Sequence, residues 1–171
     1  MANIAVIESF NNNLSKVLMN VNFGDNMYPR ISEKTQINLT FKFGLGRDET
    51  VLFYRDSGVI FKKYTLVLSD KSVYYKDDNK QIRTFMWKDV IDVKYETMIG
   101  HPEYVDFCFS TNQGEHVIFM VEFGIIGKEE VDKYVVPVVN GLKQLAILAR
   151  ENNGQSFSNQ SRSPLLSKLK K

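Results

Sequence analysis

Short segments in which apolar and polar side chains alternate every two residues follow one another along the middle of the chain. In the segment 35–43, Ile37, Leu39, Phe41 and Phe43 alternate with polar residues. A period of two is typical of a strand with one buried face. Seven further strands are predicted at 50–55, 62–69, 72–76, 81–86, 90–97, 104–110 and 116–123. Because no helical pattern separates these segments, the sequence predicts an antiparallel sandwich or small barrel rather than a parallel α/β sheet.

Turn-forming residues mark where the predicted strands end. Gly44–Asp48 follows the first strand, and Asp56–Gly58 is expected to break the second. Asp70 and Lys71 lie between two apolar strands and predict a tight turn, and Asp77–Lys80 predicts the next reversal. These short connections favour hairpins between strands that are neighbours in sequence.

An amphipathic helix is predicted over residues 3–21, before the first strand. Asn3 can cap its start by accepting a hydrogen bond from the backbone. The apolar residues fall at three- and four-residue steps, as expected for one buried helix face. They are Ile7, Phe10, Leu14, Val17, Leu18 and Val21.

A second helical pattern follows the last strand and continues through residue 150. Its first turn is acidic and Arg150 lies in its last turn, which suits the helix dipole. Pro137 lies inside the pattern and removes one backbone donor, so we expect a kink or two abutting helices there. The apolar stripe must be buried, and an end or face of the predicted barrel is the available partner.

The end of the chain differs in composition from the rest. Residues 152–171 are rich in serine and contain no acidic residue, which predicts a disordered tail. Its cations are Arg162, Lys168, Lys170 and Lys171. Of the 22 basic residues in the chain, 18 therefore remain in residues 1–151 against 20 acidic ones. The net charge of +2 thus combines a slightly acidic domain with a basic tail, and nothing in the folded part favours nucleic acid.

No pattern typical of catalysis, cofactor binding or metal binding is found. Cys108, the single cysteine, is expected to be a buried small apolar residue, although a strand pairing could bring it near His116. His101 and His116 are not part of a ligand cluster. The Gly44-Leu-Gly46 turn precedes a strand and not a helix, so it does not predict a phosphate site. We therefore predict no catalytic residue, no cofactor and no metal.

The segments Leu68-Ser-Asp-Lys-Ser-Val-Tyr-Tyr75 and Trp87-Lys-Asp-Val90 resemble motifs of bacterial pleckstrin-homology-like (PH-like) domains and the related GRAM-type domains. The resemblance covers about 49–150. It implies an α+β, mainly β fold: a small antiparallel barrel or sandwich that a C-terminal helix closes. Residues 1–48 would add an N-terminal helix and an extra strand, and 151–171 a disordered basic tail. Structural roles are expected for Asp70, Tyr74, Trp87 and Asp89.

Members of these families bind phosphoinositides, other lipids or proteins, so the resemblance implies a binding module. Lipid-binding members place cations near the loop between their first two core strands, where this chain has Arg47, Arg55, Lys62 and Lys63. These cations either hold anionic groups or are solvated charges at strand ends.

We expect a non-enzymatic, cytoplasmic bacterial module for protein–protein interaction or self-assembly, because exposed strand edges can pair with a partner. The first residues do not have the pattern of a signal peptide, so none is expected, and no apolar segment is long enough to span a bilayer. The alternative is a peripheral module on an anionic membrane. It would use Arg55, Lys62 and Lys63 together with the tail residues Lys168, Lys170 and Lys171.

Overall fold

The computed structural model describes residues 1–20, 26–59, 62–121 and 128–160. Its strands form two antiparallel sheets. The first has the order β1 (Val51–Val59), β2 (Lys62–Ser69), β3 (Ser72–Lys76) and β4 (Ile82–Met86). The second has the order β5 (Val90–Met98), β6 (His101–Thr111) and β7 (Gly114–Val121). The pairing in these residues joins no strand of one sheet to the other, so a closed barrel stays a prediction.

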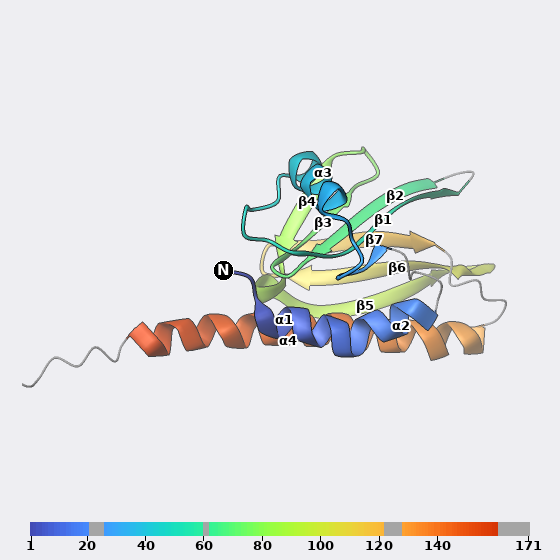
Figure 1. Cartoon of the computed structure of the whole chain (residues 1–171). Helices are drawn as coiled ribbons and strands as arrows, with labels where there is room; N and C mark the ends of the chain where they lie inside the picture. The colour runs from blue at the N-terminus through green and yellow to red at the C-terminus, as the bar shows by residue number, and fades with distance from the viewer. Residues whose placement is uncertain (21–25, 60–61, 122–127, 161–171) are drawn as a thin grey trace, which may run out of the picture.

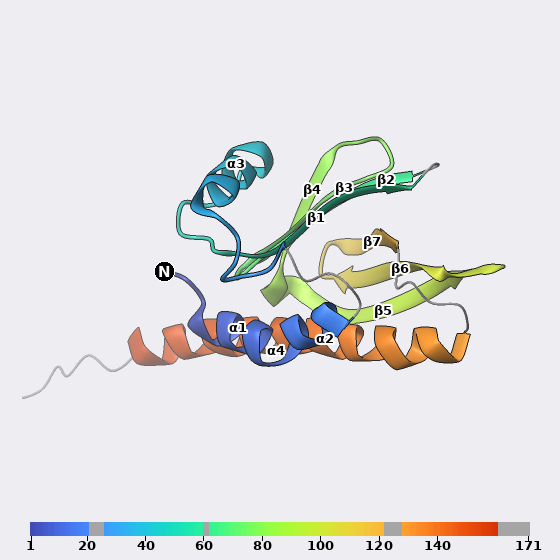
Figure 2. The ribbon, with the colours of Figure 1, turned by 45° about the vertical axis from the view of Figure 1, so that its right-hand side comes forward.

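Helices cover both sides of the sheets. The N-terminal helix consists of α1 (Ile4–Ser9), the π-helical turn η1 (Phe10–Leu14) and α2 (Ser15–Asn20). It runs beside the C-terminal helix α4 (Lys128–Gln160) along one side of the molecule (Figures 1 and 2). The helix α3 (Glu33–Phe43) lies on the opposite side, against the outer face of the first sheet. The predicted α+β architecture with a C-terminal helix is thus present.

The main core draws on both sheets and on the helices α1 to α2 and α4. Trp87, in the 3-10 turn η3 (Trp87–Asp89) between the sheets, is its largest fully buried side chain. The Trp87 Nε1–H donates to the Ser69 carbonyl at 2.8 Å. The indole therefore fills the core and has its polar atom satisfied.

The predicted N-terminal helix is present, and the Asn3 Oδ1 accepts a hydrogen bond from the Val6 N–H at 3.3 Å. Its buried residues Val6, Phe10, Leu14 and Leu18 are four residues apart. In a regular α-helix, a side chain four residues further along points about 40° away from the first one. The π-helical turn takes an extra residue, so it keeps these side chains on one face.

The prediction of a strand over residues 35–43 is wrong, because this segment is the helix α3. The Ser32 Oγ caps its start by accepting from the Thr35 N–H at 3.2 Å. Gly44 ends it in the left-handed region with φ 68°, a conformation that favours glycine. Local capping thus selects the helix, although the apolar residues alternate as in a strand.

Two further boundaries differ from the prediction. Asp56–Gly58 does not break β1, because Asp56 pairs with Thr65 and the Thr65 Oγ–H donates to the Asp56 Oδ1 at 3.0 Å. The helix α4 runs through Pro137 as one helix to Gln160, so two abutting helices are not formed. The helix α4 thus includes residues 151–160, whereas Lys168, Lys170 and Lys171 lie outside the described residues, and the disordered tail stays a prediction.

The first sheet is buried on both faces in its middle strands. Leu66 and Leu68 of β2 belong to the main core. Val67 of β2 and Tyr74 of β3 belong to a second cluster that Leu39 and other residues of the α3 segment complete. The helix α3 thus covers an outer face that would otherwise be exposed, and this packing fixes the side of α3 that faces solvent.

Candidate functional site

An open groove of about 550 Å³ runs along the solvent side of α3. Its walls come from α3, from the residue before its cap and from the loop that follows it. The lining residues are Ile31, Glu33, Gln36, Ile37, Thr40, Phe41, Arg47 and Glu49. After Gly44 the chain turns back, so that Arg47 and Glu49 lie beside the helix they follow. We call this the α3 groove.

The α3 groove presents apolar side chains to solvent. Phe41 is 84% exposed and Ile37 is 47% exposed. Leu39, which lies between them in sequence, and Phe43, which follows Phe41, are buried. Residues four apart share a helix face, so the alternation in sequence divides into a buried pair and an exposed pair. An aromatic side chain exposed to this degree next to a second apolar residue is a typical feature of a binding surface.

The floor of the α3 groove is fixed by Glu49. The Glu49 Oε1 accepts from the Gly46 N–H at 3.1 Å and from the Tyr74 O–H at 2.8 Å. The Glu49 Oε2 accepts from the Ser69 O–H at 2.5 Å. Burial, followed by the bond to Glu49, raises the pKa of Tyr74 well above its usual range. This network ties the loop after α3 to the first sheet.

The helix α3 is also held on its other flank. The rings of Phe43 and Tyr74 meet edge to face with centroids 6.5 Å apart. The Lys42 Nζ lies 3.4 Å from the Asp56 carboxylate and 5.6 Å from the Phe43 ring centroid. The exposed apolar residues therefore lie on a helix that packs and pairs with the first sheet.

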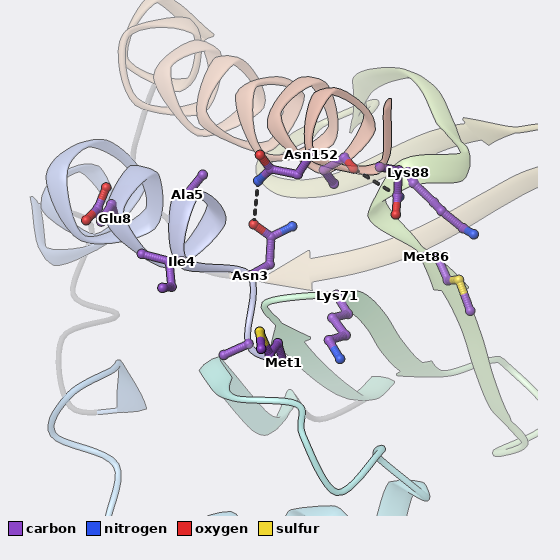
Figure 3. Close-up of a pocket in the computed structure, with 12 residues that line it drawn as sticks. Met1, Asn3, Ile4, Ala5, Glu8, Lys71, Met86, Lys88 and Asn152 are labelled. Carbon is purple, nitrogen blue, oxygen red and sulfur yellow. Dashed lines mark hydrogen bonds between the residues drawn. The ribbon is translucent and has the colours of Figure 1, made fainter. Parts of the chain in front are cut away.

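A second, larger pocket of about 720 Å³ lies between α1, the β2–β3 turn, the end of β4 and α4 (Figure 3). The Asn152 Nδ2–H donates to the Asn3 Oδ1 across it at 2.8 Å. Its cations are Lys71, Lys88 and the N-terminal ammonium of Met1, and its acid is Glu8. The Lys71 Nζ at 2.5 Å and the Met1 ammonium at 2.7 Å share the Asp48 carboxylate.

The cations predicted from the sequence do not gather at one place. Arg47 lies in the loop before β1, close in sequence to Val51, which pairs with Ser69. It lines the α3 groove. Arg55 pairs with Leu66 in the middle of the hairpin, and Lys62 and Lys63 begin β2 at its far end. Arg47 and these lysines lie at opposite ends of β1, a strand of nine residues that is about 26 Å long. The side chains of Lys62 and Lys63 lie outside the described residues.

The motif residues Asp70, Trp87 and Asp89 lie where the two sheets and the N-terminus meet. Asp70 is fully buried, and its carboxylate accepts from the Thr50 N–H at 2.7 Å and from the Asn3 N–H at 2.5 Å. The Asp89 carbonyl accepts from the Asn112 N–H at 3.3 Å. Asp70 therefore ties the β2–β3 turn to the start of β1 and to α1.

Cys108 and His116 lie on opposite faces of the second sheet, because Cys108 pairs with Val117 and Phe109 pairs with His116. Burial, followed by nearby acidic residues, raises the pKa of the Cys108 thiol. Among the described residues no group of His, Cys, Asp and Glu could hold a metal ion. In the same residues, no helix combines the length and the apolar character that crossing a bilayer requires.

No protein-family profile matches this chain, and no curated protein matches it. Among solved structures, it aligns with a PH-domain-containing bacterial protein from Exiguobacterium sibiricum 255-15 at a TM-score of 0.40 and 17% sequence identity. The alignment covers 71% of this chain and 64% of that chain. This chain thus spans less than two thirds of that protein, and neither a ligand nor a site residue is carried over from it.

Proposed function

We propose that this protein is a non-enzymatic binding module of PH-like type that binds another protein chain in the α3 groove. The observation that carries the proposal is the exposure of Phe41, at 84%, on a helix that is anchored to the first sheet. Exposed aromatic residues in preformed grooves are typical anchors of protein interfaces, where a few such side chains supply most of the binding energy.

The charges of the α3 groove favour a protein ligand over a polyanion. Its lining contains two acidic residues, Glu33 and Glu49, and one cation, Arg47. A surface for phosphate groups would instead gather cations. An apolar centre with charges of both signs at its rim matches the usual anatomy of a protein interface. The peripheral-membrane alternative, with Arg55, Lys62 and Lys63, stays a prediction.

The rigidity of the groove supports the same proposal. Glu49 accepts three hydrogen bonds from Gly46, Ser69 and Tyr74, and the Ser32 cap and Gly44 define both ends of α3. A surface that is already ordered loses little conformational entropy when it binds. The groove can therefore bind a partner with modest contact area.

Site-specific photo-crosslinking tests the proposal. A photoreactive phenylalanine analogue at position 41 is expected to crosslink to a protein in the cells in which the chain is made naturally. The same analogue at position 99 is the control, because Ile99 is 99% exposed in the β5–β6 turn of the other sheet. Crosslinking at 41 and not at 99 supports the proposal. An absence of crosslinked protein at position 41, or equal crosslinking at both positions, overturns it.

A further inference from the structure

The α3 groove carries opposite charges at its two ends. Glu33 lies in the first turn of α3, and Arg47 lies in the loop beyond its last turn. Ile37 and Phe41 lie between them. A surface with this order of acid, apolar centre and cation is complementary to itself when two copies meet in opposite directions.

The spacing along α3 allows such a pairing. Two antiparallel helices related by a two-fold axis at Leu39 place Ile37 of each copy beside Phe41 of the other. Glu33 lies six residues before this centre, so it faces the C-terminal end of α3 in the second copy, where the loop that begins at Gly44 carries Arg47.

We infer that the α3 groove binds a second copy of this chain, with the two α3 helices antiparallel across a two-fold axis. The inference rests on the proposed function and names its partner. Each copy contributes Phe41 as an anchor to the other, and Glu33 of each copy pairs with Arg47 of the other. Both ion pairs form at the rim, where they set orientation more than affinity.

The position of α3 leaves room for this arrangement. The helix lies on the outer side of the first sheet, on the opposite side of the molecule from α1, α2 and α4 (Figures 1 and 2). Of the other charges near it, Glu49 accepts hydrogen bonds from Gly46, Ser69 and Tyr74, Lys42 pairs with Asp56, and Asp48 pairs with Lys71. Lys34 of one copy would approach the C-terminal end of α3 in the other, where a cation is favourable.

The size of the groove predicts a weak dimer. A single short helix with its adjoining loop buries less than the roughly 1,200 Å² that marks the lower limit of standard interfaces. The dimer should therefore form and dissociate rapidly, and its population should depend on protein concentration in the micromolar to millimolar range.

Sedimentation velocity of the full chain from about 10 µM to about 1 mM tests the inference. The weight-average sedimentation coefficient is expected to rise with concentration towards that of a dimer. Phe41→Glu should raise the dissociation constant at least about tenfold without changing the thermal midpoint, since Phe41 is mainly solvent-exposed. Ile99→Glu is the matched control and should behave as the unchanged chain.

Charge exchange identifies the two-fold geometry. Glu33→Arg and Arg47→Glu should each weaken self-association, whereas an equimolar mixture of the two variants, or the chain carrying both substitutions, should associate as the unchanged chain does. A monomer at every concentration, or a dimer that Phe41→Glu leaves intact, overturns the inference. A crosslink from position 41 to a different protein would then retain the proposed function, so the two failures are distinguishable.

Discussion

Asp70 shows how one side chain can organise three segments of this protein. Its carboxylate is fully buried without a cation among its hydrogen-bond donors, and it accepts from the backbone of Asn3 and Thr50. The Asp70 N–H in turn donates to the Thr50 carbonyl at 3.0 Å. A buried carboxylate is tolerated only when such donors replace its water.

Asp70→Asn is expected to lower the free energy of unfolding by about 2–4 kcal/mol. The amide keeps one acceptor oxygen but directs an NH2 group at a backbone donor. Urea denaturation measures the change, and Glu8→Gln, at an exposed acid of α1, is the control with an expected change within about 0.5 kcal/mol. Equal stability of the two variants would contradict the role of Asp70.

His116 makes stability depend on pH. Its Nδ1 lies 2.9 Å from the Tyr75 Oη, and its ring lies 4.5 Å from the Phe85 ring. Burial, followed by the charge of Arg83, lowers the pKa of His116 from its ordinary value of 6.5. The unfolded chain therefore binds the proton first as pH falls, and this favours unfolding.

We expect the free energy of unfolding to decrease as pH falls from 7 through 6.5, the ordinary pKa of histidine, and His116→Gln should flatten this part of the curve. A separate decrease should begin near pH 3.8, because ion pairs with Arg83 and Lys143 lower the pKa values of Asp77 and Asp92 in the folded state. Denaturant titrations at a series of pH values measure both steps. If the free energy of unfolding of the unchanged chain and of His116→Gln depends on pH in the same way between pH 7 and 5, His116 does not contribute.

At the scale of elements, α3 determines both the second cluster and the groove. Val67 and Tyr74 are buried under it, while Ile37 and Phe41 remain on its solvent side. A signal for this arrangement exists in the sequence. The continuous apolar residues of β2 and β3 are typical of strands that are covered on both faces, so a covering helix could have been sought. Ser32 and Gly44 mark its ends.

Leu39→Ala should cost about 2–4 kcal/mol of unfolding free energy, whereas Ile37→Ala should cost less than about 1 kcal/mol. Leu39 is 8% exposed and contributes to the second cluster, whereas Ile37 is 47% exposed. Both substitutions introduce alanine into the same helix, so each serves as the control for the other. If this segment were a strand, Ile37 and Leu39 would lie on the same face, and both substitutions would lower the free energy of unfolding equally. Chemical denaturation measures the two changes.

At the scale of the whole molecule, the N-terminal and C-terminal helices are part of one core. Leu14 and Leu18 of the N-terminal helix and Leu142 and Leu145 of α4 belong to the same cluster as the inner residues of both sheets. The predicted division at residue 49 stays a prediction, but residues 1–20 supply buried side chains that this core requires. Gly141 of α4 lies against Leu14, so the two helices are in close contact there.

Gly141→Ala should lower stability by about 1 kcal/mol, although alanine favours a helix more than glycine does. An added Cβ would lie 2.8 Å from the Leu14 Cδ1 and 3.2 Å from the Leu14 Cβ, and Leu14 is 1% exposed. A double-mutant cycle with Leu14→Ala provides the control. The second substitution should relieve the clash, with a coupling of about 0.5–3 kcal/mol. Additive effects would show that the helices are not in close contact there.

Elements with local signals were predictable from the sequence. The hairpin turn at Asp70, the Asn3 cap, the N-terminal helix and the strands from β1 to β7 follow from residue period and turn chemistry. The C-terminal helix was also predictable, but α4 continues to Gln160, beyond its predicted end at residue 150. Other features depend on contacts between distant segments. Which side of the helix over residues 35–43 is buried, the side of Ile37 or that of Leu39, depends on Val67 and Tyr74, which are distant in sequence. Burial is a property of contacts between such segments, so the α3 groove emerges only once the sheet and the helix are packed.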